Sequence, residues 1–170
     1  MIDQNLIKIY EQSFISHWDN KALTDYGEPE VLLYADVAKG VARLHIIYEK
    51  MHIRKGDKIA IVGRNSTKWV MAYMATITYG AVVVPILQDF NANDIHHIVN
   101  HSEAALLFVS DFIWENLEED KMPELRAVFS LNDYRCICQH DGETVQKMLL
   151  TVDREFHQRY PKGFGREDVK

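Results

Sequence analysis

Apolar residues recur at helical spacing in the first segment, which predicts an amphipathic helix over Ile2–Trp18. A β-hairpin is predicted next, because the short extended segments Lys21–Tyr26 and Glu30–Leu33 are joined by the turn residues Gly27-Glu28-Pro29. From Tyr34 the apolar positions again fall three or four apart. This spacing predicts a second amphipathic helix of about fifteen residues.

A regular alternation of strands and helices is predicted for the middle of the chain. Asn65-Ser66 offers an N-cap for a helix that ends at Gly80, and Asn91 offers a cap for the next helix. Asp111–Glu119 is predicted as a short helix. The four apolar segments predicted as strands are Lys58–Val62, Ala81–Ile86, Ala105–Val109 and Ala127–Leu131. They begin roughly 22–24 residues apart, the length of a compact βα unit, so we expect an α/β fold with a mainly parallel sheet flanked by helices.

The last part of the chain is predicted as one amphipathic helix over Glu143–Tyr160, which Pro161 terminates. Lys162–Lys170 is polar, contains glycine and has nothing to pack, so we interpret it as a linker or a truncated end. The predicted organisation is therefore one partial domain over residues 1–161, followed by the segment 162–170.

One segment raises the question of a membrane. Trp69–Leu87 holds nineteen residues without a charge, close to a spanning length. Gly80 and Pro85 interrupt it, so we interpret it as a buried helix followed by a buried strand. No transmembrane segment is expected.

Composition narrows the choice of function. The chain has 170 residues, 47% hydrophobic, and carries a net charge of −6 without a basic stripe, which argues against a nucleic-acid partner. Cys136 and Cys138, the two cysteines, cannot build a disulfide framework. We therefore expect a reducing compartment and a cytoplasmic location.

Phosphate-binding and nucleophile motifs are missing from the sequence. It contains no G-x-x-x-x-G-K-[ST] loop, and the turn Gly63-Arg64-Asn65 is too poor in glycine for a dinucleotide fingerprint. The one G-x-G, Gly163-Phe164-Gly165, follows a helix. No G-x-S-x-G elbow surrounds Ser66.

Two clusters have metal or redox chemistry as an alternative interpretation. His97 and His101 stand four apart beside His96, but further ligands are missing, and we expect all three to point to solvent or an interface. Cys136-x-Cys138 lacks a second pair and is not C-x-x-C, so we interpret both as ordinary thiols. No metal site is expected.

A set of short matches in a fixed order resembles the opening region of the adenylate-forming enzymes, the superfamily of acyl-CoA synthetases. The resemblance covers about residues 5–130 and is closest to the long-chain fatty-acid ligases. The matching residues are Ala22–Asp25, Tyr34, Gly56-Asp57, Asn65-Ser66, Trp69, Gly80-Ala81, Val84-Pro85, Ser102-Glu103 and Leu106–Val109.

The resemblance implies part of the large N-terminal domain of a ligase. Such a parent enzyme activates a carboxylic acid, here a fatty acid, with ATP and Mg²⁺ to acyl-AMP and transfers it to CoA. The family's phosphate loop with its Lys, its aromatic-Thr-Glu segment, its ribose-binding Asp and its lid Lys are absent from this chain. We therefore expect no catalytic or cofactor-binding residues within the chain, no bound cofactor, and no activity in isolation. Gln88 and Asp89 match no family motif and receive no role.

Two further expectations concern an alternative function and the oligomeric state. The alternative to a ligase fragment is a stand-alone α/β module that binds a partner or a small ligand without catalysis. The helix over Ser66–Tyr79 is apolar nearly all round, and an unfinished sheet leaves an edge. We therefore predict a symmetric homodimer at micromolar concentration or below.

Overall fold

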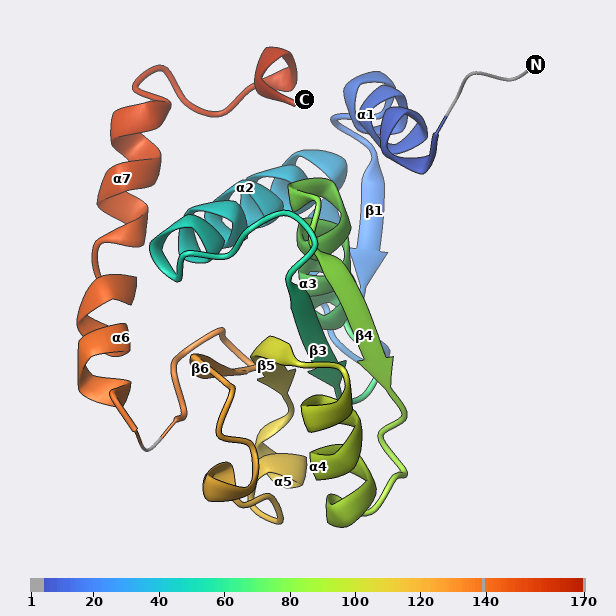
Figure 1. Cartoon of the computed structure of the whole chain (residues 1–170). Helices are drawn as coiled ribbons and strands as arrows, with labels where there is room; N and C mark the ends of the chain where they lie inside the picture. Colours follow the sequence, from blue (N-terminus) through green and yellow to red (C-terminus); the bar gives the residue numbers. More distant parts are fainter. Residues whose placement is uncertain (1–4, 139, 170) are drawn as a thin grey trace.

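A computed structural model describes residues 5–138 and 140–169 (Figure 1). Its centre is a parallel sheet in the order β4-β3-β5-β6. The strands are β3 (Lys58–Val62), β4 (Val82–Ile86), β5 (Ala104–Val109) and β6 (Ala127–Ser130). The predicted α/β class and the four parallel strands are confirmed.

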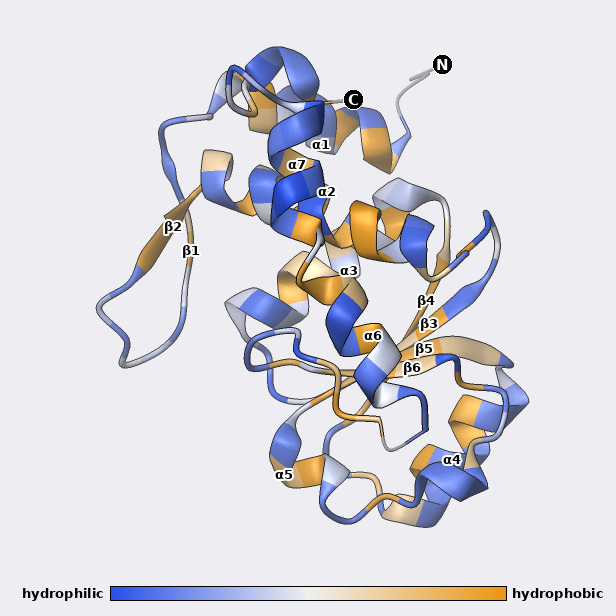
Figure 2. Cartoon of the chain, turned by 90° about the vertical axis from the view of Figure 1, so that its left-hand side faces the viewer, coloured by the Kyte–Doolittle hydropathy of each residue, from blue (hydrophilic) through white to orange (hydrophobic). Residues whose placement is uncertain are grey.

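The strands are continuous apolar runs because both faces of the sheet are covered. Every residue of β5 and β6 is buried. On one face, Ile59, Leu106 and Phe129 join a core with the helices α2 (Tyr34–Lys50) and α3 (Thr67–Tyr79). On the other face, Ala60 and Leu107 join a second core with α4 (Ala92–His101). Figure 2 shows the apolar residues gathered in the strands.

The predicted caps set the ends of the crossover helices. Ser66 Oγ accepts a hydrogen bond from the Trp69 N–H at 3.1 Å, and Gly80 ends α3 with a left-handed φ of 87°. Asn91 caps α4 in the same manner, through the Asp94 N–H. Two shorter elements, α5 (Asp111–Trp114) and η1 (Glu119–Lys121), connect β5 to β6.

The N-terminal elements agree with the prediction over the described residues, and residues 2–4 of the helix predicted over Ile2–Trp18 lie outside them. Helix α1 (Leu6–Ser16) precedes an antiparallel hairpin of β1 (Lys21–Thr24) and β2 (Val31–Leu33). In the loop between the two strands, Asp25 accepts hydrogen bonds from the Thr67 N–H at 2.8 Å and the Thr67 hydroxyl at 2.9 Å. These contacts join the hairpin to the start of α3.

The single helix predicted over Glu143–Tyr160 is wrong. The chain forms α6 (Gly142–Leu149) and α7 (Val152–Arg159), with a break at Leu150 and Thr151. At the break, the Thr151 N–H and hydroxyl both donate to the Met148 carbonyl, at 2.9 and 2.7 Å. This closes the last turn of α6 instead of continuing it.

The expectation that Lys162–Lys170 has nothing to pack is also wrong for its described part. Phe164 is buried and stacks on Trp18 and Phe156, with ring centroids 6.2 and 6.0 Å away. Arg166, in the short turn η2 (Arg166–Asp168), pairs with Asp19. The segment therefore packs between α7 and the end of α1, as the position of η2 in Figure 1 shows.

Helix α3 is better covered than its sequence predicts. All its residues are buried or half-buried, because α2 lies on one side and the sheet on the other. The exposed apolar face on which the homodimer prediction rested is therefore absent from α3. Across the described residues no helix is both long enough and apolar enough to cross a membrane. Trp69–Leu87 divides into α3 and β4, as expected.

Candidate functional site

A crevice of about 670 Å³ lies at the carboxyl ends of the parallel strands. The strand order reverses between β3 and β5, since β4 lies on one side of β3 and β5 on the other. In open α/β sheets this reversal leaves a gap between the loops where ligands bind. The lining residues are Asp25, Arg64, Ser66, Lys68, Gln88, Asp89, Ser110, Phe112, Ile113, Leu131 and Asn132.

Gly63 allows the loops at the base of the crevice to approach closely. A Cβ on Gly63 would lie 2.7 Å from Leu131 Cδ1 and 3.4 Å from Ser110 Cβ. The loops after β3, β5 and β6 therefore meet at a position without a side chain. From the sequence, this turn shows only that a dinucleotide fingerprint is absent. The sequence alone does not predict the close approach of the three loops.

One wall of the crevice is braced by the carboxylate of Asp111. It accepts hydrogen bonds from Ser130 Oγ (2.6 Å), Asn132 Nδ2 (3.0 Å) and Arg135 Nη2 (2.5 Å). Burial opposes ionisation of Asp111, but these hydrogen bonds and the Arg135 charge outweigh it and hold its pKa below the usual range. The network holds the loop after β6 in place. It also pairs the ionised Asp111 carboxylate with donors from within the protein.

The opposite wall carries cationic side chains. Arg64 is exposed and has no ion-pair partner among the residues that the structure describes. Lys68 lies over the Tyr134 ring, 5.2 Å from its centroid, and the Tyr134 hydroxyl donates to the Lys68 carbonyl at 2.6 Å. Ser66 and Asp25 already accept the first N–H groups of α3. The helix start is thus occupied by protein groups, and Arg64 is the cation open to a ligand.

Exposed apolar residues flank this polar crevice. Phe112 lines it and is 78% exposed, and Leu87, which directly precedes Gln88, is 66% exposed. The loop holding Gln88 and Asp89 thus borders the crevice, which sequence reasoning left without a role. Within the described lining, the hydroxyls of Ser66 and Ser110 have no histidine beside them to act as a base. The crevice can bind a polar or anionic group, but these residues alone form no catalytic triad.

The three histidines of α4 do not all point to solvent. His96 is buried, and its Nε2 accepts a hydrogen bond from the Glu118 N–H at 3.1 Å. His97 and His101 stack their rings, with centroids 5.7 Å apart. The buried face of α4 therefore includes His96 as well as isoleucine and valine side chains. The described residues contain no cluster of three His, Cys, Asp or Glu side chains arranged for a metal.

The sulfur atoms of the two cysteines lie closer together than the interpretation of both as ordinary thiols implies. Cys136 Sγ and Cys138 Sγ lie 2.8 Å apart, and both residues are half-buried. The only signal in the sequence is their separation by two residues, which places side chains on one face of an extended segment.

A second, smaller cavity of about 160 Å³ lies between α1, α2, α3 and the C-terminal segment. Phe14 and Phe164 line it, together with His45. His45 Nε2 donates to the Ala75 carbonyl at 3.1 Å and lies 3.0 Å from Thr78 Oγ1. Burial lowers the pKa of His45, against the effects of the Ala75 hydrogen bond and the Glu49 charge.

The model of the AMP-binding enzyme family matches residues 11–163, which is most of the chain. The chain therefore belongs to the AMP-binding enzyme family.

Individual relatives are acyl-CoA synthetases. Long chain acyl-CoA synthetase 3 of Arabidopsis thaliana is 32% identical over 92 residues, which are 54% of this chain and 13% of that protein. The putative acyl-CoA synthetase YngI of Bacillus subtilis (strain 168) is 33% identical over 79 residues, 46% of this chain and 13% of that protein. The chain thus aligns with only a small part of each relative's length.

Solved structures share the fold. The anthranilate CoA ligase AuaEII, in complex with anthranoyl-AMP, superposes with a TM-score of 0.70 at 17% identity, over 77% of this chain and 25% of that protein. A putative long-chain-fatty-acid CoA ligase from Rhodopseudomonas palustris gives 0.68 at 18% identity, over 78% and 34%. The fold of this chain is therefore that of one portion of such ligases.

Proposed function

We propose that this chain forms the N-terminal portion of a ligase that activates a fatty acid with ATP and Mg²⁺ to acyl-AMP and transfers the acyl group to CoA. The family match over residues 11–163 carries the proposal. The long-chain relatives favour a fatty acid as the substrate. We also propose a cytoplasmic location, because two cysteines build no extracellular disulfide framework.

The crevice at the carboxyl edge fits a supporting role in this ligase. Acyl-adenylate formation requires groups that neutralise and position the triphosphate. Arg64 and Lys68 supply positive charge at the crevice, but the sequence holds no glycine-rich phosphate loop with its Lys. We therefore propose that the 170 residues alone do not adenylate a fatty acid.

Pyrophosphate release tests this part of the proposal. The purified chain with ATP, Mg²⁺ and a fatty acid should release pyrophosphate at the background rate. The matched control omits the fatty acid. Reproducible fatty-acid-dependent release by these 170 residues would contradict our account of which groups the reaction needs.

The encoding gene tests the ligase itself. An in-frame Gly/Ser/Thr-rich loop with a Lys, downstream of residue 170, would support the ligase, and the complete product should then release pyrophosphate only with a suitable acid. Long-chain and aromatic acids compared side by side would identify the substrate class. A stop codon after residue 170 would instead favour a stand-alone α/β binding module.

We further propose that the isolated chain self-associates through the edge of its sheet. Strand β4 is an outer strand, and Val82 on it is 48% exposed. Sedimentation equilibrium at micromolar concentration should show a dimer, and Val82→Lys should shift the population toward monomer. A single monomeric species across this range would refute the homodimer.

A further inference from the structure

Cys136 and Cys138 lie on a segment that turns back along the edge of the sheet. After β6 the chain reverses, and Cys136 forms an antiparallel bridge with Phe129. The Ile137 N–H donates to the Val128 carbonyl at 2.9 Å. Ile137 packs into the core that contains α4, while Cys136 packs against the core that contains α2 and α3. The backbone is thus anchored at Cys136 and Ile137, with side chains packed on both faces of the sheet.

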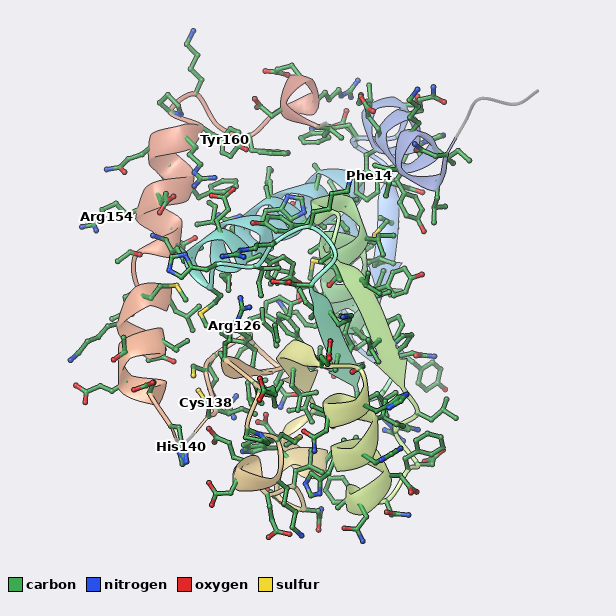
Figure 3. All side chains as sticks on the ribbon, viewed as in Figure 1. Phe14, Arg126, Cys138, His140, Arg154 and Tyr160 are labelled. Atoms are coloured by element: carbon green, nitrogen blue, oxygen red, sulfur yellow. The ribbon has the colours of Figure 1, made fainter. Side chains whose placement is uncertain are left out.

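The two sulfur atoms face each other on this anchored segment. They are 2.8 Å apart, longer than a disulfide bond of roughly 2.05 Å. Two residues of extended chain span about 6.7 Å, inside the Cα separation that disulfides tolerate. Closing a bond between them therefore requires only a small bend at Ile137. Figure 3 labels Cys138 on the segment that leads from β6 toward α6.

Small reagents can reach the pair, since both residues are half-buried and neither is enclosed. Gln146 of α6 accepts a hydrogen bond from the Cys136 N–H at 3.3 Å, and Gly142 leaves open space beside Cys138, where a Cβ would lie 4.0 Å from the sulfur. A glycine at this position keeps one approach to Cys138 clear of a side chain.

We propose that Cys136 and Cys138 form a reversible dithiol–disulfide pair, a modification site whose co-reactant is a small-molecule disulfide. This inference is independent of the ligase proposal, because neither cysteine lines the crevice at the carboxyl edge.

The two thiols have different roles in the exchange. A hydrogen bond joins the two thiols, and either sulfur could donate it. With Cys136 as the donor, this bond lowers the pKa of Cys138 to about 7 although burial opposes ionisation. The same hydrogen bond, together with burial, raises the pKa of Cys136. Glu119 of η1 is a nearby charge that disfavours both thiolates. Cys138 is therefore the attacking thiolate, and Cys136 holds the proton.

The exchange balances in two steps. Cys138 Sγ attacks one sulfur of the small disulfide, that S–S bond breaks, and one thiolate leaves. The Cys136 thiol then loses its proton to solvent and attacks Cys138 Sγ, which expels the second thiolate. The protein dithiol gives up two electrons to the small disulfide, which becomes two thiols. Once Cys138 is bonded to sulfur, Cys136 no longer donates to a thiolate, so its proton is released more easily.

Glutathione redox buffers test the pair on the whole chain. Samples equilibrated from reducing to oxidising conditions are quenched in acid, alkylated and weighed intact. The wild type should pass from two alkylated thiols to none, with loss of two hydrogens and with glutathione adducts as a minor species. The midpoint should not depend on protein concentration.

Single serine variants separate the two roles. Cys136→Ser should accumulate a stable glutathione adduct on Cys138, and Cys138→Ser should react at least tenfold more slowly. Circular dichroism would check that both variants keep the fold. Adducts on wild-type Cys138 that never resolve, disulfide-linked dimers, or equal rates in the two variants would overturn the proposal. If either variant loses its fold, alkylation rates of the wild-type thiols, resolved by peptide mapping, decide the same question.

Discussion

Neighbouring donors decide which acidic side chains of this protein ionise. Asp111 and Cys138 are both partly removed from water, which by itself favours their neutral forms. Hydrogen bonds reverse that preference: Ser130, Arg135 and Asn132 donate to Asp111, and the thiol of Cys136 is within hydrogen-bond distance of Cys138 Sγ. The same principle holds Asp111 as an anion and favours the thiolate form of Cys138.

The thiolate of Cys138 has a pH dependence that can be measured. Alkylation requires the deprotonated sulfur, so its rate rises with pH through the pKa. Following iodoacetamide modification of Cys138 by peptide mapping should give a midpoint near pH 7. In Cys136→Ser the serine hydroxyl is a poorer replacement for the thiol in the hydrogen bond to Cys138. We therefore expect the midpoint to rise toward the ordinary thiol value. A wild-type midpoint at the ordinary thiol value of about 8.5 would contradict the hydrogen bond.

Helices α2 and α3 pack against each other, and polar contacts join them. The Tyr48 hydroxyl lies 3.2 Å from Thr76 Oγ1 in the buried interface, and burial raises the pKa of Tyr48. His45 makes the second polar link, to the Ala75 carbonyl. Because neutral His45 already donates from Nε2, protonation would add a charge in a site that disfavours it.

His45 therefore links stability to pH in a defined direction. Its pKa is lower in the folded chain than the ordinary value of 6.5, so the unfolded chain binds the proton more readily. The contribution is complete above pH 6.5 and is lost as pH falls from 6.5 toward the folded pKa. Urea unfolding between pH 5 and 7 should show a smaller pH slope for His45→Gln than for the wild type.

The exposed His97 of α4 provides the matched control, because His97→Gln makes the same substitution away from the buried α2–α3 interface. An unchanged slope in His45→Gln would show that His45 titrates alike in the folded and unfolded chains. The amide of the glutamine retains a donor for the Ala75 carbonyl, so the comparison isolates the proton rather than the hydrogen bond.

Sequence patterns predict helices and strands where the apolar periodicity and the capping residues agree. They miss an element boundary where a single hydrogen bond determines it. The strands and α3 follow from apolar runs, the Ser66 cap and Gly80. Apolar spacing continues across Leu150, so nothing periodic marks the break that Thr151 makes. The crevice follows from strand order, but the pairing of Asp111 with Arg135 depends on how the loop after β6 returns along that strand. No local sequence pattern predicts that the loop returns along β6.

At the scale of the molecule, the C-terminal segment completes the outer face of the helical layer. Phe164 contacts Trp18, Phe156 and Tyr160, and it lines the cavity that also contains His45. A lone aromatic residue in a polar segment gives no periodic signal, which is why the sequence reads as a linker there. The structure makes it part of the folded unit.

Removing this aromatic ring should therefore destabilise the whole chain. Phe164→Ala removes a buried side chain, and we expect the free energy of unfolding in urea to fall by about 3 kcal/mol. Lys162→Ala, at an exposed position in the same segment, should change it by less than about 0.5 kcal/mol. A loss for Phe164→Ala as small as that of the control would restore the interpretation of the segment as a linker.

The contact between Trp18 and Phe164 also has a consequence for synthesis on the ribosome. The βα units bring together residues close in sequence and can fold as they emerge, but α1 waits for a partner from nearly the other end of the chain. At about 5–20 residues per second, that delay is on the order of ten seconds. Throughout it, the apolar face around Phe14 and Trp18 lacks its final cover. During that interval, newly made chains expose this apolar face to chaperones and proteases.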